Sequence, residues 1–285
     1  MALRAVLLRR TRGTRPGLAL AFLVTALLVT ALLATALLAT GCGAPRTSWT
    51  EPATGLEFVL LPAGEFEMGS PATESGHEAG ERRHRVRLTH PVWFGRHEVT
   101  QGQWLQVMGE NPSRFPDCGL DCPVENVDAF EVAEFLDRLG KLSGATFRLP
   151  TEAEWEYACR AGTTTPFGTG ANLTSAQANY DGRYPYPGFP AGSFVGRPMP
   201  VGSYAPNAWG LFDLHGNVWE WCQDELCPYA EGPATDPVGS CAAELRVIRG
   251  GSWTFNADSA RCAVRYSHRP GDQGPSLGVR LVRAR

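Results

Sequence analysis

The chain has 285 residues, including 32 glycines, 22 prolines, eight tryptophans and eight cysteines, and its net charge is −3. This small acidic charge gives no electrostatic reason to expect a nucleic-acid partner. The glycine and proline content is typical of one loop-rich domain and argues against a helical bundle.

Residues 1–42 have the composition of a targeting segment. Five arginines precede an uncharged apolar run from Leu18 to Thr40, and Cys42 follows two residues later. This order favours a lipoprotein signal, with Cys42 as the lipidated residue. The run is also long enough to span a bilayer, so an uncleaved anchor and plain secretion are the alternatives. In each case the arginines stay inside, which predicts an extracytoplasmic domain. Lipidation or an uncleaved anchor would also tether this domain to a membrane of a bacterial-type cell envelope.

An exported chain can form disulfides. Cys118 and Cys122 lie close together in a loop, and Cys227 and Cys241 flank a Pro/Gly segment, so we predict these two bonds. At least one thiol is expected to remain free, because lipidation of Cys42 leaves an odd number. The unassigned cysteines are Cys159, Cys222 and Cys262.

The folded domain is predicted over residues 56–283, after a polar tether at 43–55. Alternating apolar and polar residues favour strands at Gly64–Met68 and Arg85–Leu88. Asp128, with Glu131 three residues on, predicts the start of an amphipathic helix that ends near Ser143–Gly144.

A second capping box predicts a helix that begins at Thr151–Glu154 and ends at Gly162. No further long helix is expected after Gly162, where short strands and turns fill the chain.

Short motifs follow one another along the whole domain. They are Phe58–Ser70, Glu98–Gln101, Arg148–Ala158, Ala178–Tyr180, Pro200–Gly202, His215–Trp221, Arg249–Trp253, Arg261–Ala263 and Gly278–Arg280. In this order they resemble the formylglycine-generating enzyme family, the sulfatase-modifying factors. The resemblance implies an α+β, C-type-lectin-like fold with little regular secondary structure.

The resemblance also implies structural calcium. One family site corresponds to Asp213, Gly216, Val218 and Glu220, which would offer two carboxylates and two backbone carbonyls. From these residues alone, a turn into a strand with Glu220 exposed is the simpler interpretation. A second family site corresponds to Asn179, Tyr180, Ser193 and Val195. The enzymes have an aspartate in place of this serine, so we expect weaker binding there.

This sequence differs from the family at the oxidative centre. The enzymes carry copper-binding cysteines at the positions of Phe255 and Ala260. Copper(I) selects thiolates, so we expect neither copper nor a catalytic residue here. The surrounding motif is instead expected to form the floor of an apolar cleft, built from Arg249, Gly250, Gly251, Ser252, Trp253 and Phe255.

A similar departure affects the disulfides of the family. The positions that pair with Cys159 and Cys262 in disulfide-bonded enzymes also lack cysteine, and one of them is Leu281. Whether Cys159 and Cys262 bond to each other stays open.

Two functional hypotheses follow. The first is a membrane-tethered, calcium-stabilised, non-catalytic binding or accessory module for a peptide, a glycan or an envelope protein. The second is an oxidoreductase of formylglycine-generating type, acting on a protein cysteine or a secreted small molecule. The sequence alone leaves open whether the protein is an enzyme.

Overall fold

The computed structural model describes residues 47–284, which belong to one compact unit. The predictions for residues 1–42 therefore lie outside the described residues. Within the described part, no helix combines the length and apolarity needed to cross a membrane.

Three small sheets form the framework. The five-stranded sheet has the order β1-β2-β5-β12-β6 and is antiparallel throughout. Its strands are Ser48–Thr50, Glu57–Leu61, Val92–Gly95, Val282–Arg283 and Phe147–Arg148, in that spatial order. Because β12 inserts between β5 and β6, the two ends of the domain meet in one sheet.

The four-stranded sheet carries the motifs that the sequence singled out. Its order is β10-β9-β7-β11, and β11 runs parallel to β7. The strands are Tyr266–His268, Arg246–Arg249, Trp219–Glu225 and Leu277–Gly278. The third sheet has the order β3-β4-β8, with strands Gly64–Met68, His84–Leu88 and Ala234–Thr235. In β4 buried and exposed residues alternate, as predicted.

Both predicted helices are present. Helix α3 spans Ala129–Ser143 and begins at the capping box of Asp128 and Glu131. Helix α4 spans Glu152–Arg160, begins at the capping box of Thr151 and ends in left-handed backbone at Ala161. A third helix, α2 (Gln101–Met108), was missed, although Thr100 and Gln103 form a capping box there too.

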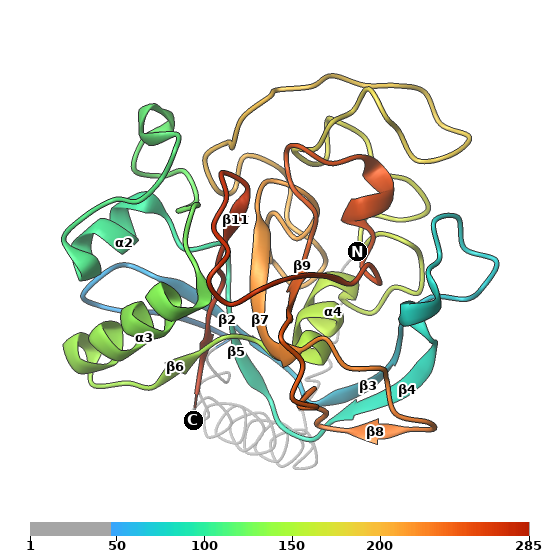
Figure 1. The fold of residues 1–285 in the computed structure, drawn as a ribbon, viewed down its shortest axis with the longest axis horizontal. Coiled ribbons are helices and arrows are strands. Elements are labelled where there is room, and N and C mark those ends of the chain that lie inside the picture. The colour runs from blue at the N-terminus through green and yellow to red at the C-terminus, as the bar shows by residue number, and fades with distance from the viewer. Residues whose placement is uncertain (1–46, 285) are drawn as a thin grey trace, which may run out of the picture. The chain divides into compact units, whose positions relative to one another are not determined.

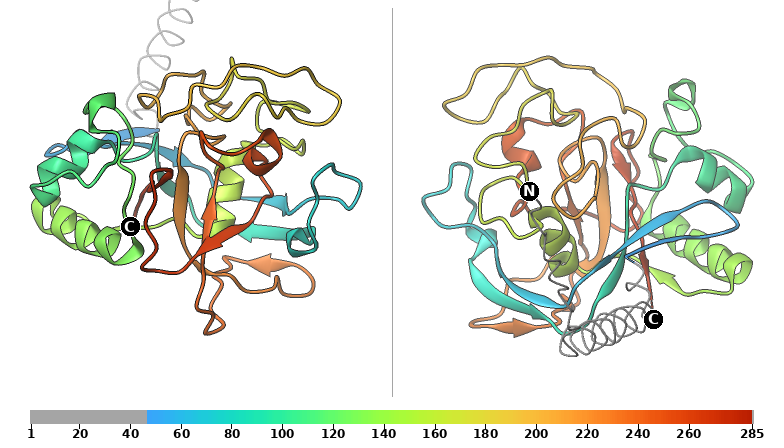
Figure 2. Two further views of the ribbon diagram at one scale, coloured as in Figure 1. Left: turned by 45° about the horizontal axis from the view of Figure 1, so that its top comes forward. Right: turned by 180° about the vertical axis from the view of Figure 1, so that it is seen from behind.

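Helix α4 lies at the centre of the domain. Figure 1 shows β7, β9 and α4 between two flanks, one holding α2 and α3 and the other holding β3, β4 and β8. The reverse view in Figure 2 shows the same arrangement. All nine residues of α4 are buried, including three glutamates and an arginine. Because burying an unpaired charge is costly, the charged side chains of α4 must find partners inside the protein.

Candidate functional site

Arg249, the first residue of the expected cleft motif, is a buried structural residue. It ends β9, and its side chain is fully enclosed. Its Nη2 donates to Glu156 Oε2 at 2.6 Å, its Nη1 donates to the Cys262 carbonyl at 2.8 Å, and its Nε lies 3.3 Å from Glu152 Oε1. Arg249 therefore fixes β9 to α4 and offers no group to a ligand.

The glycines that follow turn the chain sharply. Gly250 and Gly251 have φ values of 104° and 77°, the left-handed region that favours glycine. A Cβ at Gly251 would lie 3.0 Å from the Ala260 Cα, so the segment that ends at Ala260 packs directly on this turn. Ser252 is buried, and its hydroxyl lies 3.0 Å from that of Thr254.

Apolar groups occupy both positions at which the resemblance predicts the thiols of the family. Phe255 is half-buried and meets Trp219 edge-on, with ring centroids 5.4 Å apart. The Tyr266 ring lies 5.9 Å from Phe255 and is 46% exposed. Ala260 is buried in the short 3₁₀ helix Ala257–Ala260. The site thus presents aromatic carbon where a metal would need sulfur.

A second aromatic group surrounds Trp253. Phe115 meets the Trp253 ring edge-on at 5.4 Å, and Phe194 lies parallel to it at 6.5 Å. The Arg183 guanidinium lies 4.2 Å from the Phe194 ring centre, and that of Arg197 lies 5.8 Å from Phe115. Sequence reasoning missed both phenylalanines, because separate loops bring them to Trp253 and no local pattern marks them.

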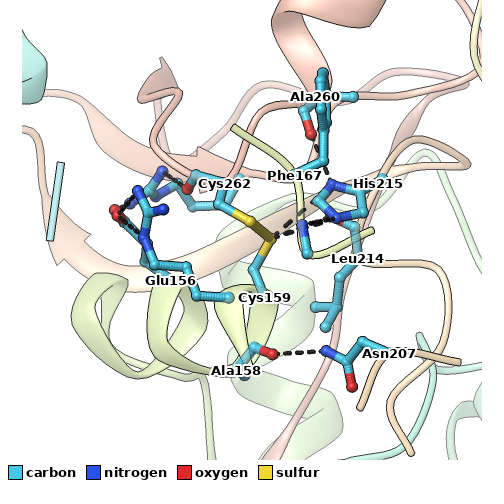
Figure 3. Close-up of a disulfide and its surroundings, with 12 residues drawn as sticks. Glu156, Ala158, Cys159, Phe167, Asn207, Leu214, His215, Ala260 and Cys262 are labelled. Carbon is cyan, nitrogen blue, oxygen red and sulfur yellow. Dashed lines mark hydrogen bonds and ion pairs between the residues drawn. A yellow bond between two sulfur atoms is a disulfide. The ribbon is translucent and has the colours of Figure 1, made fainter. Parts of the chain in front are cut away.

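The open question about the remaining cysteines has a structural answer: Cys159 in α4 is bonded to Cys262 (Figure 3). The predicted Cys118–Cys122 and Cys227–Cys241 bonds are also present. Among the cysteines in the described residues, Cys222 alone is free. It is buried, and burial raises the pKa of its thiol well above the ordinary value, which disfavours the reactive thiolate.

His215 lies against the Cys159–Cys262 bond, as Figure 3 shows. Its Nδ1 donates to the Ala260 carbonyl at 2.8 Å, and its Nε2 accepts from the Gly168 amide at 3.0 Å. The Cys159 sulfur is 3.9 Å from both ring nitrogens, which is a packing contact. Burial lowers the pKa of His215 to about 4, which keeps it neutral. This group is arranged as packing rather than as a metal site.

Glu220, of the first calcium motif, is buried, so the expectation of an exposed side chain is wrong. Its carboxylate accepts from Arg280, at 2.7 Å for the shortest contact, and from Trp155 Nε1 at 2.6 Å. Asp213 lies nearby in left-handed backbone with a φ of 57°, and its Oδ2 accepts from the Gly202 amide at 2.6 Å. Burial raises the pKa of Asp213 to about 6.

A third carboxylate, Glu98, belongs to the same group, and sequence reasoning did not include it. It is fully buried; its Oε1 accepts from Asn217 Nδ2 at 3.1 Å, and its Oε2 has no partner. Burial and then the charge of Asp213 raise the pKa of Glu98. Arg280 acts on all three carboxylates: it pairs with Glu220, and its charge lowers the pKa of Glu98 and Asp213.

Such a surplus of buried negative charge fits a bound divalent cation. Arg280 and Trp155 already engage Glu220, so Asp213 and Glu98 are the carboxylates of this group that would hold it.

The second family calcium motif carries less charge. Asn179 is buried and its Oδ1 accepts no hydrogen bond, so this oxygen is of a type that fits a calcium ligand. Its Nδ2 donates to the Arg197 carbonyl and to Asn217 Oδ1. Ser193 brings no carboxylate, and Asp181 forms a two-pronged ion pair with Arg183, which lowers its pKa. Asp181 is therefore already neutralised and does not replace the missing aspartate.

Comparisons with known proteins agree on one family. The model of the sulfatase-modifying factor enzyme 1-like domain matches residues 45–285. The formylglycine-generating enzyme of Streptomyces coelicolor is 41% identical over 195 residues, which cover 63% of this chain and 60% of that protein. Serine/threonine-protein kinase pkn1 of Chlamydia pneumoniae is 28% identical over 80% of this chain and only 38% of its own length.

Solved structures give the same fold. PvdO from Pseudomonas aeruginosa superimposes with a TM-score of 0.71 at 28% identity, covering 85% of this chain and 99% of that one. The predicted α+β, loop-rich fold is thereby confirmed.

Proposed function

The chain belongs to the family of sulfatase-modifying factor enzyme 1-like domains, and from this premise we propose that it is a non-catalytic binding or accessory module. Its ligand is a peptide, a glycan or an envelope protein. The N-terminal segment holds it at the cell envelope, by lipid on Cys42 or as an anchor, and calcium stabilises the fold.

The observation that carries this proposal is the state of the cysteines. Phe255 and Ala260 stand where the resemblance to the family places its two thiols. Cys159 and Cys262 are bonded to each other, and Cys222 is buried with a raised pKa. The described residues therefore offer no accessible thiolate pair for copper, which is the ligand type that copper(I) selects.

The same segment supports binding. Trp253, Phe255 and Tyr266 are all at least partly exposed and lie beside a motif whose arginine is used internally. Aromatic rings with one apolar face and a polar edge suit peptide and sugar ligands. An accessory role also agrees with a relative that is named as a kinase and is much longer than this domain.

The alternative is an oxidoreductase of formylglycine-generating type. The 41% identity to an enzyme of that name favours it. It would require chemistry that does not use the thiol pair.

One experiment separates the two. The full chain, with copper, oxygen and a Cys-x-Pro-x-Arg peptide, is expected to give no aldehyde in a hydrazide-trapping mass-spectrometric assay, and formation of aldehyde would make the protein an enzyme. In parallel, peptide and glycan arrays are probed with the wild-type chain and with Tyr266→Ala. We expect Tyr266→Ala to lose binding, and Leu142→Ala, at an exposed site on α3, to keep it.

Calcium has its own test. A ligand present at 100 times its Kd adds about 2.7 kcal/mol to the free energy of unfolding, so chelation is expected to lower Tm by several degrees. Asp213→Asn should remove this response, whereas Asp137→Asn, in an exposed ion pair on α3, should keep it. If chelation leaves the Tm of the wild-type chain unchanged, the calcium part of the proposal is wrong.

A further inference from the structure

A separate cavity lies between the start of α4 and the segment 227–241, which includes strand β8. Its volume is about 460 Å³, within the usual range for small-molecule sites. Most of its wall is apolar. The apolar side chains are Met68, Ala153, Tyr229, Ala234, Pro237 and Val238.

The walls of this cavity are held in place without a ligand. The Cys227–Cys241 bond closes the loop that forms one side. The Tyr229 ring lies between His84, at 4.7 Å, and the Arg265 guanidinium, at 3.9 Å. Its hydroxyl donates to Glu152 Oε1 at 3.1 Å. A binder would therefore meet a preformed site, which reduces the entropy lost on binding.

The two charged side chains Arg265 and Asp224 in the cavity wall differ in whether they have a partner of opposite charge. Arg265 donates to both oxygens of Glu152 and to the carbonyls of Gly80 and Cys227, so four of its five N–H groups are used. Asp224 is 4% exposed and forms no ion pair with any basic side chain of the described residues. Its two oxygens accept only the amides of Glu152, at 2.8 Å, and Gly239, at 2.6 Å.

A structural role explains part of the placement of Asp224. The bond to the Glu152 amide satisfies a donor in the first turn of α4. It does not explain why a carboxylate without a counter-charge lines a mostly apolar cavity, since each oxygen can still accept another hydrogen bond. Anions are disfavoured here, because Glu152 and Glu154 also lie close to Asp224 and the Arg265 guanidinium is already paired with Glu152.

We propose that this cavity binds a small organic cation, with an ammonium group against Asp224 and an apolar body against Ala153 and Val238. This site goes beyond the proposed function, since its residues are separate from the Arg249–Phe255 motif and from the calcium ligands. The first probe is 2-phenylethylamine, added to the isotope-labelled full chain and followed by NMR. 2-Phenylethanol and 3-phenylpropanoate, of similar shape, serve as the neutral and anionic comparisons.

At pH 7.5 we expect the amine to shift amides around residues 224–241 and to bind at least tenfold more tightly than the alcohol or the carboxylate. Burial, then Glu152 and Glu154, raise the pKa of Asp224 to about 6. The other groups at the cavity are His84, Tyr229 and Arg265. Protonation of Asp224 should therefore weaken amine binding about tenfold at pH 5, one unit below that pKa.

Two variants make the result decisive. Asp224→Asn removes the charge but also disturbs the start of α4, so the second variant is Val238→Trp, at an exposed position of the cavity wall, which fills the cavity and keeps the hydrogen bond from the Glu152 amide to Asp224. Both are expected to lose the amine, and Leu142→Trp on α3 is expected to keep it. No binding by the wild-type chain, equal binding of amine and alcohol, or full binding by Val238→Trp would each overturn the proposal.

Discussion

Glu156 shows how single buried charges hold the motif region together. Its Oε1 accepts from Arg160 Nε at 2.8 Å and from the Gly69 amide at 2.8 Å, while its Oε2 accepts from Arg249. Arg160 and Arg249 lower its pKa, although burial acts in the opposite direction. One carboxylate thus joins α4, β9 and the end of β3.

Replacing Glu156 by Gln is expected to reduce the free energy of unfolding by about 3–5 kcal/mol, because two buried arginines lose their shared partner. Urea denaturation at pH 7 measures this. Because the folded-state pKa is depressed, the stabilisation is present above the unfolded pKa and is lost as the pH falls. The control is Glu134→Gln in the exposed pair with Arg138, which should cost less than about 1 kcal/mol. Equal losses for the two variants would show that burial of the pair is unimportant.

Some features of the motif region could be predicted from residue identities, and the others depend on tertiary contacts. The absence of thiols at Phe255 and Ala260 is evident in the sequence, as are the motif positions. That Arg249 is enclosed by Glu152 and Glu156 depends on how α4 meets β9, which no local pattern encodes. The Cys159–Cys262 bond likewise joins residues 103 apart in sequence.

At the scale of elements, local end signals predicted helices well when the helix was long or followed a marked motif. The side chain of Asp128 accepts from the Phe130 and Glu131 amides, and α3 runs for 15 residues with one apolar face. Helix α2 has the same kind of cap but only eight residues, too few to show a clear periodicity. Its stability comes from tertiary packing, including the stacked pair Trp104–Phe135 at 4.7 Å.

The cap of α3 gives a second prediction. Asp128→Ala should lower the free energy of unfolding by about 1 kcal/mol, because two first-turn amides lose their acceptor. Asp128→Asn keeps an oxygen acceptor and should cost only a few tenths of that. Thermal unfolding followed by circular dichroism compares the two. If both variants lose the same stability, the charge of Asp128 rather than its hydrogen bonds stabilises α3.

At the scale of the whole molecule, long-range pairing decided what the sequence did not predict. The strands at Gly64–Met68 and His84–Leu88 are visible as alternation, but the parallel pairing of β11 with β7 and the insertion of β12 between β5 and β6 are not. The group of carboxylates Glu98, Asp213 and Glu220 likewise depends on the tertiary fold, since Glu98 and Glu220 lie far apart in the chain. The family motif contains Asp213 and Glu220 but not Glu98.

Buried carboxylates also make the stability of the whole domain depend on pH. Burial raises the pKa of Glu125 to about 7 and that of Asp224 to about 6. Glu125 is enclosed, and its Oε2 has no partner. A raised folded-state pKa means that the folded chain binds the proton more tightly than the unfolded chain, so stability is gained as the pH falls through that pKa. Below about pH 6.5 the half-buried His97 and the buried His215, whose pKa values are lowered to about 4, act in the opposite direction.

In chelator we therefore expect Tm to rise between pH 8.5 and pH 6.5, through Glu125 and through Glu98, whose pKa is also raised by burial, and to level off or fall at lower pH as the unfolded histidines take up protons. Differential scanning calorimetry of the full chain at constant ionic strength measures this. Glu125→Gln keeps an acceptor for the Phe115 amide, which donates to Glu125 at 2.9 Å. Because it cannot titrate, it should flatten the rise while keeping the decline at low pH. A wild-type Tm that falls over this range, or a variant that keeps the full rise, would show that another group controls the pH dependence.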